Sequence, residues 1–180
     1  MKLKQKIIFG LITIFCIVFL AGCIKYQTFE DFFHQEIKEM HIGEEDYSYS
    51  LIHTELNVVH ESDAVAVFKE QNNRGDQIFI AYFEKKEKQW EWKQTRGAEW
   101  NTPVKWSSMK QVPYIYSGPI SDNSIAEVYA GNVPANIINI NGDKRFWYAI
   151  SPIKDVKVTT IKEDGTEEII EEIDYEKIQS

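Results

Sequence analysis

The sequence predicts a mainly β, α+β chain with one amphipathic helix followed by many short strands. Three observations predict this fold class. Apolar residues recur at helical spacing up to Met40, and a period of two then replaces the helical period. Turn residues, among them Asn141-Gly142-Asp143 and Asp164-Gly165, separate the later apolar runs. Short antiparallel strands in such a series are typical of a sandwich or a strongly curved sheet.

The helix is expected over residues 28–41. Thr28 is suited to cap its amino terminus, with Asp31 at the position of a capping-box partner, and Gly43 is suited to end it. One face is apolar and should pack on the sheet. Its members are Phe29, Phe32, Phe33, Ile37 and Met40.

The strand candidates are alternating or continuous apolar runs bounded by turn residues. They lie at residues 47–59, 64–68, 77–84, 114–116, 125–130, 135–140, 145–150, 156–160 and 167–173. Trp90 and Trp92 add a further strand, on which they share one face. Residues 97–113 are less regular, because Pro103 and Pro113 limit sheet pairing. Ser117-Gly118-Pro119 is interpreted as a turn.

Length and charge restrict the function. The 180 residues carry 20 basic and 28 acidic side chains, for a net charge of −8. This length fits one domain, predicted at residues 28–180. An acidic chain with scattered lysines is not suited to bind nucleic acid, which requires a basic patch.

The amino terminus has the features of a secretory signal peptide. Lys2, Lys4 and Lys6 precede an apolar run at residues 7–20. This run is shorter than the roughly 20 apolar residues that span a bilayer, and we expect it to form an N-terminal signal helix, the apolar region of a signal peptide.

The run ends in Leu20-Ala21-Gly22-Cys23, which resembles the lipobox of bacterial lipoproteins. The resemblance implies a diacylglyceryl group, with acyl chains such as palmitate, on the thiol of Cys23. It also implies that a signal peptidase recognises Leu20, Ala21 and Gly22 and cuts before Cys23. Residues 1–22 would then be a lipoprotein signal peptide, and residues 23–27 a lipidated tether.

This processing would change charge and thiol content. Loss of three lysines leaves 17 basic against 28 acidic side chains, a net charge of −11. Cys16 would be removed and Cys23 modified, which excludes thiol catalysis and cysteine–zinc sites. The excess of lysine over arginine indicates a Gram-positive, Bacillus-like source. The chain should then lie on the outer face of the cytoplasmic membrane, and its body resembles small surface lipoproteins of such bacteria in general character.

Few residues suggest chemistry. His53 and Glu55 share one strand face, but two ligands do not make a metal site. No Gly-x-Ser-x-Gly elbow or glycine-rich phosphate loop occurs in the sequence. Arg74-Gly75-Asp76 resembles an integrin-binding tripeptide, although a turn explains it better. We therefore expect no catalysis, no metal and no cofactor.

Aromatic residues give the remaining hypothesis. Trp90 and Trp92 should face inward, because charged residues alternate with them. The irregular segment carries the candidate binding surface, in which the two tryptophans are expected to be exposed: Arg96, Glu99, Trp100 and Trp106. The predicted function is a non-catalytic binding or accessory module that contacts an envelope protein or a cell-wall glycan. The alternatives are a cell-envelope hydrolase built from scattered carboxylates and an immunity or structural partner of another envelope protein.

Overall fold

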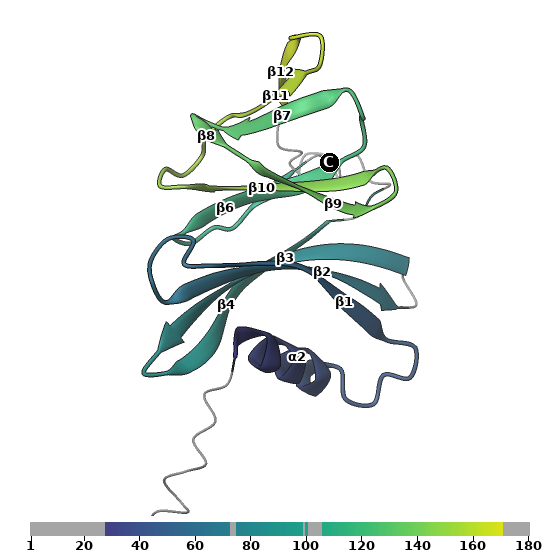
Figure 1. Ribbon diagram of the computed structural model, residues 1–180, viewed down its shortest axis with the longest axis vertical. Helices are drawn as coiled ribbons and strands as arrows, with labels where there is room; N and C mark the ends of the chain where they lie inside the picture. The colour runs from purple at the N-terminus through teal and green to yellow at the C-terminus, as the bar shows by residue number, and fades with distance from the viewer. Residues whose placement is uncertain (1–27, 73–74, 99, 101–105, 171–180) are drawn as a thin grey trace, which may run out of the picture. The chain divides into compact units, whose positions relative to one another are not determined.

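The computed structural model describes residues 28–72, 75–98, 100 and 106–170 (Figure 1). This part of the chain is mainly β, as predicted, with one helix and twelve strands. The chain divides after Lys38 into two compact units, which are described separately. The single domain at residues 28–180 stays a prediction.

Helix α2 covers Phe29–Met40, in agreement with the prediction. The side-chain oxygen of Thr28 accepts a hydrogen bond from the amide of Asp31 at 3.1 Å, which confirms the predicted cap. The apolar face is buried at Phe29, Phe32, Phe33 and Ile37. Met40, the last member of the series, is 52% exposed. No helix in the described ranges is long and apolar enough to cross a bilayer.

The strands form three antiparallel sheets of four strands each. Sheet A has the order β1 (Ser48–Leu56), β2 (Asp63–Asn72), β3 (Gly75–Lys86) and β4 (Gln89–Ala98). Sheet B has the order β5 (Ser107–Ser108), β6 (Tyr114–Ile120), β10 (Lys144–Ser151) and β9 (Asn136–Asn141). Sheet C has the order β12 (Glu167–Ile170), β11 (Val158–Lys162), β7 (Ile125–Ala130) and β8 (Val133–Pro134).

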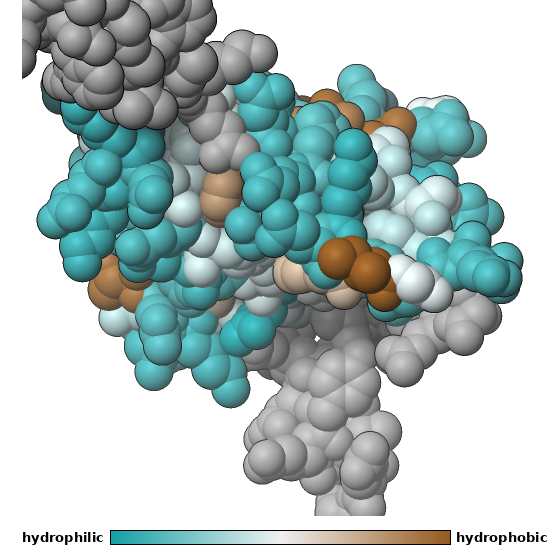
Figure 2. All heavy atoms as spheres, turned by 90° about the horizontal axis from the view of Figure 1, so that it is seen from below, coloured by the Kyte–Doolittle hydropathy of each residue, from teal (hydrophilic) through white to brown (hydrophobic). Residues whose placement is uncertain are grey.

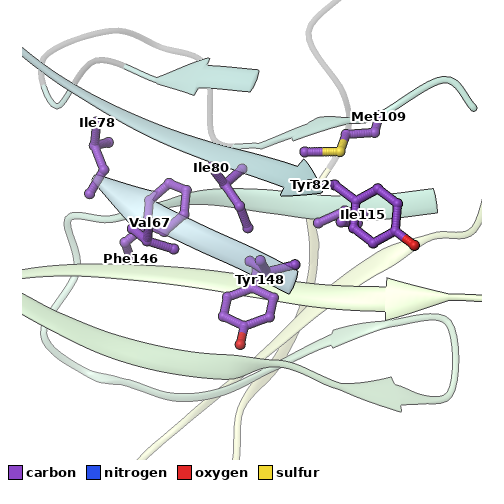
Figure 3. Packing of buried hydrophobic residues seen from close by; sticks show 9 residues of the cluster. Val67, Ile78, Ile80, Tyr82, Met109, Ile115, Phe146 and Tyr148 are labelled. Carbon is purple, nitrogen blue, oxygen red and sulfur yellow. The ribbon is translucent and has the colours of Figure 1, made fainter. Parts of the chain in front are cut away.

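The three sheets are stacked, with sheet B in the middle (Figure 1). Sheets A and B enclose one core, of which Figure 3 shows the packing: Val65, Val67, Ile78, Ile80, Tyr82, Met109, Ile115, Phe146 and Tyr148. Sheets B and C enclose the other: Trp106, Tyr116, Ile120, Val128, Ala130, Trp147, Ala149 and Val158. Because both faces of sheet B are covered, β6 and β10 contain continuous buried runs instead of an alternation.

Two predicted turns are confirmed and one is wrong. Gly142 and Gly165 take the positive φ values, 55° and 85°, that such hairpin turns require. Ser117, Gly118 and Pro119 lie within β6 and pair with β10. The proline is tolerated because β5 pairs only with Tyr116 and Ser117, so that no strand of the described residues pairs with Pro119 on this edge of β6.

Candidate functional site

The lipobox residues Leu20, Ala21, Gly22 and Cys23 lie outside the described residues. Their predicted roles in recognition and lipidation therefore stay predictions. Glu99, a member of the candidate binding surface, also lies outside them.

Trp106 is a core residue, so the expectation that it is exposed is wrong. Its side chain is 7% exposed, and its ring centroid lies 5.7 Å from that of Tyr116 between sheets B and C. The indole nitrogen donates a hydrogen bond to the carbonyl of Ile170 at 2.9 Å. The cause is the pairing of β5 with β6, which the irregular sequence of this segment does not reveal.

Trp100 and Arg96 also contribute to the fold. The Trp100 ring is partly buried against the core between sheets A and B, and the ammonium group of Lys144 lies 5.4 Å from its centroid. The guanidinium of Arg96 donates to the carbonyl of Ser108 at 2.8 Å and so connects β4 to β5. The described members of the candidate surface therefore do not form one exposed patch.

The other tryptophan pair lies on β4. The ring of Trp92 packs edge-on against Phe68 and Phe83, with centroids 5.9 and 4.7 Å away, which confirms the inward expectation for this residue. Trp90 is partly buried, and the ammonium group of Lys85 lies 5.3 Å from its ring centroid.

A buried tyrosine and aspartate hold the β1–β2 loop. The Asp63 carboxylate is fully buried and accepts hydrogen bonds from the amides of Val58, Val59 and His60 at 2.7, 3.1 and 3.1 Å. It also accepts the Tyr82 hydroxyl at 3.1 Å. Burial and the Asp63 charge raise the pKa of Tyr82 above its usual range, so the phenol stays a donor.

A second tyrosine connects sheets A and B. The Tyr148 hydroxyl donates a hydrogen bond to Glu55, and the side-chain amide of Asn136 donates to the same carboxylate at 3.3 Å. The Nε2 atom of His53 lies 3.5 Å from the hydroxyl oxygen of Tyr148. His53 and Glu55, which were predicted to share one strand face, therefore both lie beside the same tyrosine. Burial, followed by the bond to Glu55, raises the pKa of Tyr148.

A third group lies between the loop after α2 and the strands β1 and β2. Tyr47 donates to Glu70 at 2.9 Å, and its ring stacks on His41 with centroids 3.6 Å apart. The two ring nitrogens of His41 lie 3.1 Å from Glu44 and 3.7 Å from Glu70. Burial, with Glu70, raises the pKa of Tyr47. Sequence reasoning missed all three tyrosines, because their acidic partners are distant in the sequence or lie across a loop.

The remaining motifs add no ligand set. The described residues hold no group of three or more His, Cys, Asp or Glu side chains suited to a metal ion. In the Arg74-Gly75-Asp76 tripeptide, Arg74 lies outside them. Asp76 belongs to β3 and forms an ion pair with Lys69 at 3.0 Å.

Exposed hydrophobic residues are dispersed over the described surface. Figure 2 shows one face, on which hydrophilic residues predominate and the hydrophobic ones lie in small separate groups. The large hydrophobic side chains that are exposed belong to different elements and loops: Met40, Ile42, Leu56, Val59, Val112, Ile153 and Ile169.

Comparison with known proteins gives no relative: no protein-family model, no curated protein and no solved structure matches the chain.

Proposed function

We propose that this protein is a membrane-anchored extracytoplasmic lipoprotein that serves as a non-catalytic binding or accessory module of the cell envelope. One observation carries the proposal: Leu20-Ala21-Gly22-Cys23 follows a basic segment and a short apolar run. A thiol at Cys23 is the group that a diacylglyceryl chain would modify.

The order of the elements along the chain supports a role in which the lipid anchor presents a binding surface at the membrane. A tether of residues 23–27 reaches only about 3.3–3.6 Å per residue, so the body would stay close to the bilayer. The chain enters the stack of sheets through β1, which belongs to sheet A. Sheet C is the layer farthest along the stack from this entry. The polar groups around Tyr82 and Tyr148 are engaged in internal contacts, which supports a binding role over a catalytic one.

The test is processing in a Gram-positive host. Intact mass of the membrane fraction should show loss of residues 1–22 and gain of a diacylglyceryl group at Cys23. Cys23→Ser should leave an uncleaved precursor, whereas Cys16→Ser, a matched change within the removed segment, should mature normally. If Cys23→Ser is cleaved and released like the native chain, the lipoprotein proposal is wrong.

A cell-envelope hydrolase built from scattered carboxylates is the alternative, and its candidate site is the group around His41. The carboxylates of Glu44 and Glu70 lie beside one imidazole there, and side chains of these types serve as general acids and bases. A hydrolase would release soluble fragments from purified cell walls and would lose this activity on Glu70→Gln. If the native chain releases no fragments, the alternative fails.

A further inference from the structure

Sheet C, the outer layer of the stack, has one buried and one open face. Val128, Ala130, Val158 and Thr160 are buried toward sheet B, with 0–2% of each side chain exposed. Because side chains alternate along a strand, their neighbours in β7 and β11 point away from sheet B.

The register brings these neighbours together in two rows. Thr159 of β11 lies opposite Tyr129 of β7 and Ile169 of β12. Ile161 lies opposite Glu127 and Glu167 on the same two strands. We call these six residues the outer face of sheet C. The row through Thr159 is mostly apolar, and in the row through Ile161 two glutamates flank the isoleucine.

The outer face is exposed and acidic. Ile169 is 59% exposed, and Glu127 and Glu167 are exposed as well. The adjoining turn adds Glu163 and Asp164. The structure describes all of β7, β8, β11, β12 and the turn at residues 163–166. Lys162 is the single basic side chain in these described segments. It is engaged with Glu168 at 2.8 Å and Asp122 at 3.8 Å.

We propose that the outer face of sheet C docks a basic polypeptide segment, one that presents lysine or arginine side chains around an apolar centre. Charge complementarity identifies the occupant. Ile161, Ile169 and the ring of Tyr129 supply apolar contact area. The carboxylates of Glu127 and Glu167, at the border of this apolar area, complement the cationic side chains of the bound segment. A neutral sugar would leave these charges unmatched.

This docking role deepens the proposed function and rests on it for location. A lipid at Cys23 would hold the chain at the membrane surface, and the outer face of sheet C would then be within reach of other envelope proteins.

The experiment uses the full lipidated chain in phosphatidylcholine nanodiscs, whose neutral lipid does not attract a cationic probe. The probe is a short labelled peptide in which lysine alternates with valine, and binding is measured by fluorescence anisotropy. Glu127→Gln/Glu167→Gln should weaken binding by at least about fivefold, and Ile169→Thr should weaken it as well. The control Glu61→Gln/Glu87→Gln removes the same charge from exposed positions in two loops of sheet A, and should change binding less than about twofold.

Three results would overturn the inference. The peptide does not bind, or both double variants weaken binding equally, which would indicate general charge attraction. Alternatively, a chitooligosaccharide binds and the sheet C variants abolish that binding, which would assign the face to a glycan.

Failure of the proposed function is measured separately. Cys23→Ser precursor in the same nanodiscs should bind the peptide as the lipidated chain does, because the outer face does not involve the lipid. If mass spectrometry shows that the native chain carries no lipid and this chain still binds the peptide, the anchor is contradicted and the docking face is retained.

Discussion

Trp106 and Trp100 are close in the sequence but lie in different environments. Trp106 is enclosed between sheets B and C, and its indole nitrogen is bonded to the carbonyl of Ile170. Trp100 lies partly exposed at the border of the core between sheets A and B. The two side chains should therefore differ in their contribution to stability.

We predict that Trp106→Ala lowers the free energy of unfolding by about 3–5 kcal/mol, because it leaves a cavity and an unsatisfied carbonyl. Trp100→Ala should cost less, since part of its ring stays in contact with water. Urea unfolding of both variants, followed by circular dichroism, measures the difference. A larger loss for Trp100→Ala would contradict the assignment of Trp106 to the core.

The turn between β3 and β4 contains backbone strain. Glu87 and Lys88 have φ values of 50° and 78°, in the left-handed region that favours glycine and asparagine. The β9–β10 turn consists of Gly142 and Asp143, and the residue with positive φ, at 55°, is there a glycine.

Replacing Glu87-Lys88 by Asn-Gly should raise the free energy of unfolding by about 1 kcal/mol, because glycine adopts positive φ without the Cβ penalty. The matched reverse change, Gly142→Lys, should lower it by a similar amount. Thermal melts of the two variants check the pair. A fall in melting temperature for the Asn-Gly variant would show that side-chain contacts of the native turn outweigh its strain.

At the scale of elements, α2 combines a capped terminus with one buried face. Its acidic first turn (Glu30, Asp31) and Lys38 in the last turn match the helix dipole. Such local terms are each worth at most about 1 kcal/mol at a surface, so burial of the apolar face must supply most of the stability.

Phe33→Ala should therefore lower the free energy of unfolding by about 3–5 kcal/mol, since the side chain is 0% exposed. Lys38→Ala, at an exposed position on the same helix, is the control and should change stability little. Guanidinium unfolding of the full chain measures both. An unchanged midpoint for Phe33→Ala would mean that burial of this side chain does not contribute to stability.

At the scale of the whole molecule, buried phenols connect the elements. Tyr82 holds the β1–β2 loop through Asp63, and Tyr148 joins sheets A and B through Glu55. Tyr47, in the segment that precedes β1, is bonded to Glu70 of β2. Burial is the largest cause of the raised pKa in each of the three.

These tyrosines predict a loss of stability at alkaline pH. Below the ordinary tyrosine pKa of about 10, folded and unfolded chains both hold the phenolic protons, and the stabilisation is complete. Above it the unfolded chain releases protons that the folded chain retains, so the free energy of unfolding falls with rising pH. Urea midpoints across this range measure the slope, and Tyr148→Phe should make it shallower. An unchanged slope in Tyr148→Phe would contradict the buried, protonated state of this phenol.

Local patterns predicted much of the fold. The cap at Thr28, the helix after it and the turns at Gly142 and Gly165 depend on neighbouring residues, and the structure confirms them. The strand at 125–130 has the same bounds as β7, because alternation and turn residues define it. The 117–119 interpretation was wrong, since pairing with β10 outweighs the turn preference of glycine and proline.

The sequence by itself determined the mainly β fold class and the single helix, because hydrophobic period and turn chemistry are local properties. The lipobox, also a local motif, carries the proposed function. Only the tertiary structure decided that Trp106 is buried, that Arg96 bonds to a backbone carbonyl, and that Tyr148 meets Glu55. Each depends on which sheets stack, and therefore on contacts between residues far apart in the chain. The open face of sheet C follows from the same stacking, since no further sheet of the described residues covers this outermost layer.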